Sequence, residues 1–147
     1  MDLGLDGRVC VVTGASRGIG LATSRRLVAE GAQVLMVARD EEPLSAAAED
    51  LGAEWLAGDV TDAACDERIV ATAVEQLGRI DVLVNNAGTS RNVALDELTD
   101  DDWREQHELH VMAPMRLMRA AAPRVAGRGG GPIANVCSSS GKRPSQT

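Results

Sequence analysis

The residues best suited to chemistry in this 147-residue sequence lie near its start, in the segment Thr13-Gly14-Ala15-Ser16-Arg17-Gly18-Ile19-Gly20. The segment follows a β-favouring run and precedes a stretch of helical spacing, which predicts a strand–turn–helix junction. There Gly14 permits a tight turn, Gly18 lets the backbone approach a ligand, and Gly20 lets the helix pack closely on a sheet. A helix start presents unpaired N–H groups and a partial positive charge. The pattern therefore predicts a site for a phosphate or pyrophosphate group.

The elements that must hold this loop alternate between short apolar runs and longer stretches of helical spacing. Strands are predicted at residues 9–13, 33–38, 54–57, 81–85 and 133–137. Helices are predicted at residues 19–30, 42–51, 62–77 and 101–125. Continuous apolar strands that alternate with helices are typical of a parallel sheet covered on both faces. The sequence therefore predicts an α/β fold with residues 1–147 in a single domain.

Helix ends and one proline add local expectations. Asp40 is expected to cap the second helix, and Thr99 or Asp100 the long helix at 101–125. Pro114 lies inside that long helix and removes one helical hydrogen bond, so a kink is predicted there.

The composition limits the possible partners. The chain has no Tyr, no Phe and two Trp, so it has no aromatic platform for stacking bases, and its net charge of −7 argues against nucleic acids and anionic membranes. Cys10, Cys65 and Cys137 show neither metal-ligand spacing nor a disulfide framework, so no metal is expected. With no signal peptide and no apolar run long enough to span a bilayer, we expect a cytoplasmic protein.

Four motifs occur in a fixed order along the chain. The glycine loop is spaced Gly-x-x-x-Gly-x-Gly, and Asp59-Val60, Asn85-Asn86-Ala87-Gly88 and Ser138-Ser139-Ser140-Gly141 follow the third, fourth and fifth predicted strands. In this order they resemble the short-chain dehydrogenase/reductase family over nearly the whole chain. The resemblance implies a Rossmann-like, doubly wound parallel sheet with strand order 3-2-1-4-5.

The same resemblance implies elements that this sequence does not contain. Family members continue with two further strands and a helix, so the sheet is expected to be incomplete relative to seven strands. We therefore expect the chain to be the N-terminal part of a longer enzyme, truncated at its C-terminus, that forms homo-oligomers at full length. The fifth strand is then expected to be an exposed edge, and the long helix to expose Leu109, Met112, Leu117 and Met118.

The resemblance also implies which residues bind a dinucleotide. Asp59 and Val60 are implied to contact the adenine, and Asn86, Ala87 and Gly88 to line the ribose and nicotinamide side, while Asn85 is expected to brace neighbouring strands. The full implied cofactor-binding set is Gly14, Ser16, Arg17, Gly18, Ile19, Gly20, Arg39, Asp59, Val60, Asn86, Ala87 and Gly88.

The end of the second predicted strand indicates which dinucleotide is preferred. Relatives that prefer NAD usually carry an Asp there, whereas this sequence has Ala38 followed by Arg39. A guanidinium pairs with a 2′-phosphate through charge-assisted hydrogen bonds, and Arg17 supplies a second cation. We therefore expect NADP (NADPH) in preference to NAD; Asp40 weakens this case, although a helix cap is its expected role.

Catalysis in the family uses a Ser, a Tyr and a Lys. Ser138 matches the serine, with Ser139 as the alternative, whereas the chain has no Tyr anywhere. His110 stands where the family has an Asn in a proton relay, and both a relay role and simple packing at the helix kink are open. The resemblance implies an oxidoreductase that transfers hydride between NADP and a small-molecule carbonyl or alcohol. The alternatives are a non-catalytic dinucleotide-binding module and an interaction protein completed by a partner.

Overall fold

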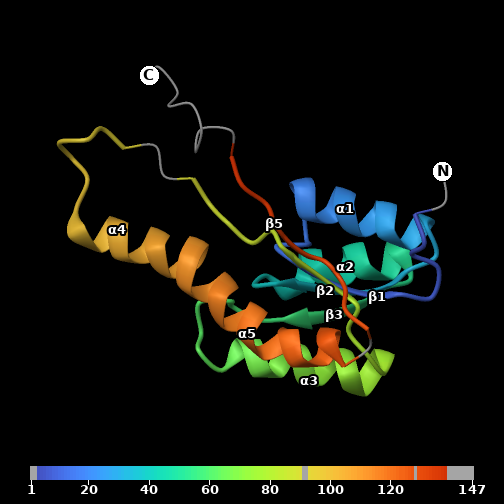
Figure 1. Cartoon of the computed structure of the whole chain (residues 1–147). Helices are drawn as coiled ribbons and strands as arrows, with labels where there is room; N and C mark the ends of the chain where they lie inside the picture. Colours follow the sequence, from blue (N-terminus) through green and yellow to red (C-terminus); the bar gives the residue numbers. More distant parts are fainter. Residues whose placement is uncertain (1–2, 91–92, 128, 139–147) are drawn as a thin grey trace.

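Five parallel strands form the centre of the molecule (Figure 1). The computed structural model describes residues 3–90, 93–127 and 129–138. The strands are β1 (Val9–Thr13), β2 (Gln33–Ala38), β3 (Glu54–Ala57), β4 (Val82–Asn85) and β5 (Ile133–Asn135). Their order in the sheet is β3-β2-β1-β4-β5, and every pairing is parallel, with Val11 opposite Leu35 and Leu83. The predicted strand order is confirmed.

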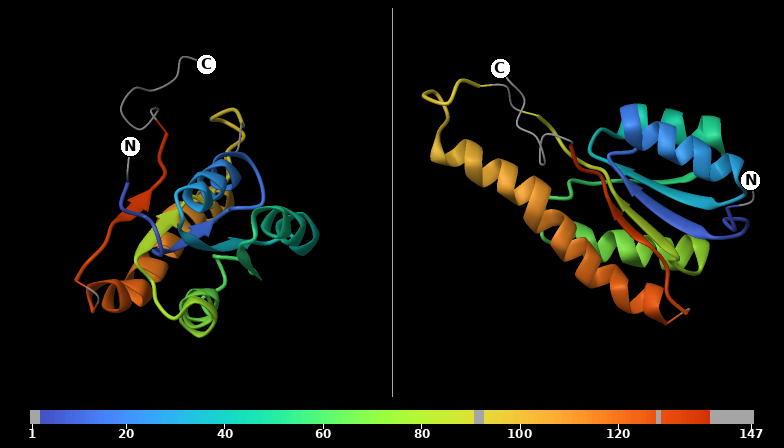
Figure 2. Two further views of the ribbon diagram at one scale, coloured as in Figure 1. Left: turned by 90° about the vertical axis from the view of Figure 1, so that its right-hand side faces the viewer. Right: turned by 45° about the horizontal axis from the view of Figure 1, so that its top comes forward.

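Helices cover both faces of this sheet (Figure 2). On one face lie α1 (Gly18–Ala29) and α2 (Glu41–Leu51), and on the other lie α3 (Cys65–Leu77) and α5 (Ala113–Ala126). All five residues of β1 are buried, and its three central residues alternate between two aliphatic clusters, with Cys10 and Val12 in one and Val11 in the other. Val11 packs with Ile69 and Leu117 on the α3 and α5 side, whereas Val12 packs with Met36 and Leu44 on the α1 and α2 side. A sheet buried on both faces explains why its strands are continuous apolar runs.

Helix α3 begins later than predicted, and Asp40 stands at its predicted position before α2 without making the expected side-chain contact. Helix α3 starts at Cys65 instead of residue 62, because the Asp62 carboxylate accepts from the Ala64 N–H at 3.0 Å and holds a turn there. Asp40 is the N-cap residue of α2, but its side chain makes no capping hydrogen bond.

The long helix predicted at 101–125 consists of three parts. Helix α4 (Asp100–His107) begins at Thr99 with a capping box, in which the side chains of Thr99 and Asp102 each accept from the other residue's backbone N–H. A π-helical turn, Glu108–Met112, follows, and α5 begins directly after it. Pro114 therefore lies in the first turn of α5, directly after the π turn.

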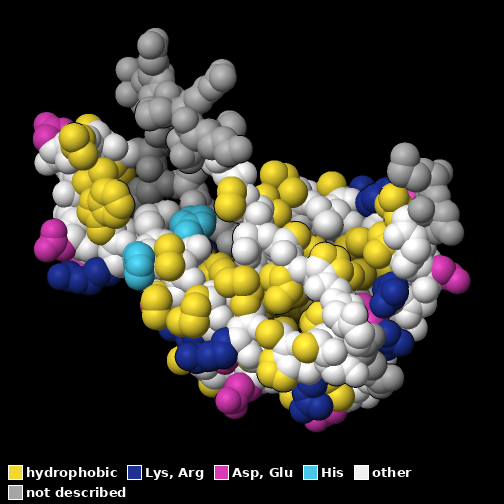
Figure 3. Space-filling view, viewed as in Figure 1, with side chains coloured by type: hydrophobic (Ala, Val, Ile, Leu, Met, Phe, Trp, Pro, Cys, Tyr) yellow, Lys and Arg dark blue, Asp and Glu magenta, His cyan; other side chains and the backbone are white. Residues whose placement is uncertain are grey.

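The expectation that this helix exposes four apolar residues is wrong for Leu117, and the other three are only partly exposed. Leu117 is only 3% exposed and belongs to the core beside α3, while Leu109, Met112 and Met118 are half-buried. The π turn rotates α5 relative to α4, and the stripe Ala113, Leu117, Ala121 and Val125 is buried instead. The large apolar side chains that are exposed in this region are Leu95, Trp103 and Val111, and Figure 3 shows apolar side chains gathered over α4.

Strand β5 ends at Asn135, two residues earlier than predicted. Its backbone pairs with β4, and the Asn85 side chain donates to Oδ1 of Asn135 at 2.9 Å, so the expected bracing role of Asn85 is what the structure shows. Ala134 and Asn135 are exposed at this edge of the sheet. Within the described residues, no helix is long and apolar enough to cross a membrane.

A buried carboxylate joins the amino ends of two strands. Asp81, just before β4, is 2% exposed and accepts a 2.9 Å hydrogen bond from the backbone N–H of Val9 at the start of β1. Its other oxygen pairs with the guanidinium groups of Arg79 and Arg8. Burial alone raises the pKa of Asp81, but the Val9 hydrogen bond and the two arginines outweigh it, so that pKa lies below its ordinary value.

We predict that Asp81→Asn destabilises the protein at pH 7 by about 1–3 kcal/mol, because the amide leaves the arginine charges uncompensated. A carboxyl whose pKa is lowered by folding stabilises the native state above its unfolded pKa, near 4, and this stabilisation is lost as the pH falls through the folded pKa. Urea unfolding at pH 7 and pH 3 measures this: the gap between wild type and variant should narrow at pH 3. A gap of constant size would contradict the assignment.

Candidate functional site

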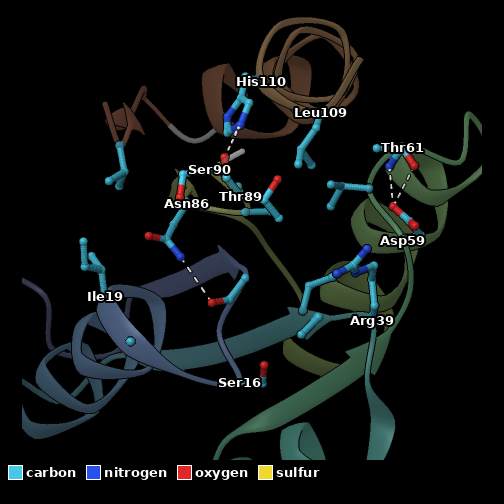
Figure 4. A pocket seen from close by; sticks show the side chains of 18 of the residues that line it. Ser16, Ile19, Arg39, Asp59, Thr61, Asn86, Thr89, Ser90, Leu109 and His110 are labelled. Atoms are coloured by element: carbon cyan, nitrogen blue, oxygen red, sulfur yellow. Dashed lines mark hydrogen bonds between the residues drawn. The ribbon is translucent and has the colours of Figure 1, made fainter. Parts of the chain in front are cut away.

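A pocket of about 960 Å³ opens at the carboxyl ends of the strands (Figure 4). Each strand contributes the segment that follows it, and one side is closed by the helix residues Glu105, Gln106, Glu108, Leu109 and His110. Ligand sites of open parallel sheets lie at this edge, and this volume is at the upper end of the usual range for a small-molecule pocket. Because all five strands are parallel, motifs more than 100 residues apart in the sequence meet here.

The glycine loop forms the floor of the pocket. Gly14 has φ +64°, and a Cβ built on it would lie 2.8 Å from the Cα of Ala87, so both the turn and the packing require glycine there. The Ala15 N–H donates to the Val37 carbonyl at 3.1 Å, which ties the loop to β2. Gly18 has φ +56°, and a Cβ built on it would meet nothing within 4 Å. The loop thus presents open backbone to the pocket at Gly18.

The start of α1 has the features of an anion site. Arg17 is its N-cap residue and provides no side-chain cap, and the first turn contains no acidic residue. The N-cap side chain therefore leaves the first backbone N–H groups of the helix uncapped, unlike those of α4 with its capping box. The macrodipole adds partial positive charge at the same point, and Arg17, an exposed side chain that lines the pocket, adds a full one.

The side chain of Asn86 holds the glycine loop against β4. Its amide nitrogen donates to the carbonyls of Thr13 and Gly14 at 3.0 and 3.2 Å. The hydroxyl oxygen of Thr13 accepts in turn from the backbone N–H groups of Asn86 and Ala87, each at 3.0 Å. Gly20 lies behind this contact, since a Cβ built on it would be 2.2 Å from the Gly14 carbonyl oxygen and 2.5 Å from the Asn86 amide nitrogen.

The segment after β3 carries a carboxylate. Oδ1 of Asp59 accepts from both the backbone N–H and the hydroxyl of Thr61, at 2.9 and 2.8 Å. Burial alone raises the pKa of Asp59, but these two hydrogen bonds and the positive charge of Arg39 outweigh it and hold that pKa below its ordinary value. Arg39, after β2, is exposed and lines the same pocket beside Asp59 (Figure 4).

His110 enters the pocket from the π turn. Its Nε2 lies 2.9 Å from the carbonyl oxygen of Thr89, and because a carbonyl can only accept, Nε2 carries the proton and donates. The other edge of the ring lies against Gly88, where an added Cβ would be 2.8 Å from Cε1. Both histidines of the chain reach the surface on the face viewed in Figure 3.

The segment after β5 forms the remaining wall. Val136, Cys137 and Ser138 are exposed and line the pocket. Ser139, the alternative catalytic serine, lies outside the described residues. Cys10 and Cys65 are buried away from the pocket lining, and burial raises the pKa of the Cys10 thiol to about 11.

The pocket brings together the sequence-predicted site residues with one exception. Gly20 does not line it and acts through packing, whereas the other predicted positions do line it: Gly14, Ser16, Arg17, Gly18, Ile19, Arg39, Asp59, Val60, Asn86, Ala87, Gly88, His110 and Ser138. Ile19 is 64% exposed, so it serves the pocket and not the packed face of α1. The sequence-based prediction missed Thr13, Thr61 and Thr89, whose hydroxyl or backbone groups hold the predicted residues. For Thr13 the available signal was its position directly before the glycine loop.

Fold and site together define a Rossmann-type α/β protein with a nucleotide-sized pocket at its strand ends. The family model described as short chain dehydrogenase matches residues 8–147, and the chain belongs to this family. Gluconate 5-dehydrogenase of Gluconobacter oxydans is 39% identical over 139 residues, which are 91% of this chain and 54% of that protein. The chain spans about half the length of the curated relatives it matches.

Solved structures show the same similarity. L-sorbose reductase from Gluconobacter frateurii, complexed with NADPH and L-sorbose, superposes with a TM-score of 0.93 at 39% identity, covering 99% of this chain and 57% of that one. A metagenomic short-chain oxidoreductase in complex with NADP gives a TM-score of 0.88 at 37% identity, covering 96% and 66%.

We predict that Asn86→Asp disrupts the glycine loop. A carboxylate in place of the amide would face the Thr13 and Gly14 carbonyls with no proton to donate, at a cost of about 1–3 kcal/mol. Urea unfolding measures the cost. Asn135→Asp is the matched control, because the new carboxylate can still accept from Asn85, and within the described residues the only bond of the Asn135 amide nitrogen is a long one of 3.8 Å to the Met118 sulfur at the exposed sheet edge. Equal destabilisation by the two variants would contradict the role of Asn86.

Proposed function

We propose that this chain is the cofactor-binding portion of an NADP-dependent oxidoreductase that transfers hydride between the nicotinamide and a small-molecule carbonyl or alcohol. The observation that carries the proposal is the uncapped start of α1 at the floor of a pocket of about 960 Å³, beside Arg17 and the open backbone of Gly18. Membership of the short chain dehydrogenase family supports the reaction type. Two relatives are named for gluconate and L-sorbose, which supports a small polar substrate for this chain as well.

The lining residues fit a dinucleotide in one orientation. Its pyrophosphate would lie at the N-terminus of α1, where N–H groups and the macrodipole stabilise anions. Asp59 and Val60 would hold the adenine end, where the Asp59 carboxylate stays ionised at neutral pH and accepts hydrogen bonds. Ile19, with its exposed apolar side chain, and Gly88 would border the nicotinamide end.

The preference for NADP rests on charge at the end of β2. Arg39 is exposed at the pocket, and Ala38 stands where a carboxylate would repel a 2′-phosphate. Asp40 also lines the pocket, and its negative charge opposes the same ligand. Two structurally similar proteins are bound to NADPH or NADP, which supports the assignment for this chain.

In the proposed reaction the bound cofactor supplies or accepts the hydride. Ser138 would hydrogen-bond the substrate oxygen from the wall after β5, and His110 would border the same end of the pocket. The 147 residues contain no Tyr, so a phenolic acid–base group must come from outside this sequence. Loss of a positioned acid–base group typically slows a reaction by about 10²–10⁴-fold.

The absence of Tyr also supports a second candidate, a non-catalytic dinucleotide-binding module. The two candidates differ in what the coding sequence contains after Thr147. The oxidoreductase requires a continuing reading frame that encodes a Tyr-x-x-x-Lys segment, whereas a stop codon there, together with NADPH binding and no carbonyl turnover, would favour the module.

We predict that Arg39→Ala weakens NADPH binding about tenfold or more and NADH binding about twofold or less, because only NADPH carries the 2′-phosphate. Asp40→Asn should shift the ratio in the opposite direction. Fluorescence titration with each cofactor measures both effects. Arg25→Ala is the control, since Arg25 is exposed on α1 and its charge pairs with Asp50. Equal losses for NADPH and NADH in Arg39→Ala would refute the preference.

A further inference from the structure

The π turn Glu108–Met112 brings two side chains of the long helix onto one face. In a regular α-helix of 3.6 residues per turn, residues eight apart point about 80° away from each other. The π turn inserts one extra residue, and Glu108 and Arg116 form an ion pair across it. The same turn directs His110 into the pocket. The position of His110 and the Glu108–Arg116 ion pair therefore both depend on the π turn.

The first contact holds the segment after β4. The His110 Nε2–H donates to the Thr89 carbonyl at 2.9 Å, and the ring edge packs on Gly88. Both interactions are with the backbone of the two residues that follow Asn86-Ala87. His110 thus fixes the path of the chain at the end of the pocket assigned to the nicotinamide.

The second contact holds the segment after β3. The Arg116 guanidinium donates to the Thr61 carbonyl at 3.4 Å, and its side chain is only 15% exposed. The N–H and hydroxyl of the same Thr61 hold Oδ1 of Asp59. Nε of Arg116 is buried without a hydrogen-bond partner among the described residues. The contacts with Glu108 and Thr61 must therefore offset the free-energy cost of burying this cation. Glu108, Arg116, Thr61 and Asp59 form one continuous chain of contacts.

We propose that the π turn is a positioning device for the cofactor groove, in which His110 holds the nicotinamide end and the Glu108–Arg116 pair holds the adenine end. The inference rests on the proposed function, and it assigns His110 to positioning through Thr89. Loops held in their binding conformation lose less entropy when a ligand binds. The contacts of His110 with Thr89 and of Arg116 with Thr61 therefore each raise the affinity for the part of the ligand that lies beside them. Arg116 does not line the pocket, so it acts on the ligand through Thr61 and Asp59.

Half-cofactors separate the two ends in one experiment. The probes are 2′,5′-ADP, which carries the adenine end, and reduced nicotinamide mononucleotide, which carries the other. Arg116→Met keeps the length of the side chain and removes the guanidinium, and it should weaken 2′,5′-ADP about three- to tenfold and the mononucleotide by less than about twofold. His110→Phe keeps a ring against Gly88 and removes the donor, and it should give the reverse pattern. Isothermal titration calorimetry measures all four affinities.

Matched controls come from the same helix. Arg119→Met and His107→Phe remove an exposed cation and an exposed imidazole, and both should leave the two affinities within about twofold of wild type. If Arg116→Met fails to fold, Arg116→Lys serves in its place, with a smaller loss confined to 2′,5′-ADP. A general loss of stability would weaken both probes equally, so it cannot imitate the crossed pattern.

The outcomes distinguish this inference from the function on which it rests. The crossed pattern supports the positioning device. Equal weakening of both probes, or no weakening of either, in variants of a protein that still binds NADPH in its wild-type form would overturn the inference and leave the proposed function standing. If the wild-type chain binds neither NADPH nor the two probes, the proposed function fails and the inference fails with it.

Discussion

The site depends on how closely β1, α1 and β4 approach one another at the glycine loop. The Asn86 amide donates to the carbonyls of Thr13 and Gly14, and it can reach them only because Gly20 has no side chain. Those carbonyls belong to the turn that orients α1, so the direction of the helix follows from this contact. With α1 so directed, its uncapped N-terminus faces the pocket and not the bulk solvent. A Cβ at Gly14 or Gly20 would separate the three elements and move the N–H groups from the pocket floor.

Charged residues at the amino ends of the strands stabilise the fold, whereas those at the carboxyl ends are available for binding. At the amino ends, Asp81 is buried with two arginines and a backbone N–H, all within the chain, so its charge serves the fold. At the carboxyl ends, Arg17 and Arg39 are exposed at a pocket and their charges are available to a ligand. Parallel strands produce this separation, because every strand ends at the same edge and every helix starts there. The helix dipoles then add positive potential to the edge where the arginines stand.

Most of the fold was predictable because its signals are local. Strands β1, β2 and β3 have the predicted limits, since each is a short apolar run bounded by a turn residue. The largest error, in the long helix, occurs where contacts from elsewhere in the chain override local preference. Pro114 indicated a kink in the long helix, but the structure has a π turn before this proline. The π turn and the burial of Leu117 follow from packing against α3 and the sheet. Asp40 has the sequence of a helix cap, yet its side chain makes no such bond.

The sequence by itself determined the order of elements, the glycine spacing and the family, because hydrophobic periodicity and short motifs are properties of neighbouring residues. It also determined which residues gather at the pocket, since each motif follows a strand of one parallel sheet. Tertiary structure alone decided how Thr13 is held on Asn86 and Ala87, and how Thr89 is held on His110. These contacts join residues from 21 to 74 positions apart. Their geometry depends on the angle at which one helix crosses the sheet, and no local pattern encodes that angle.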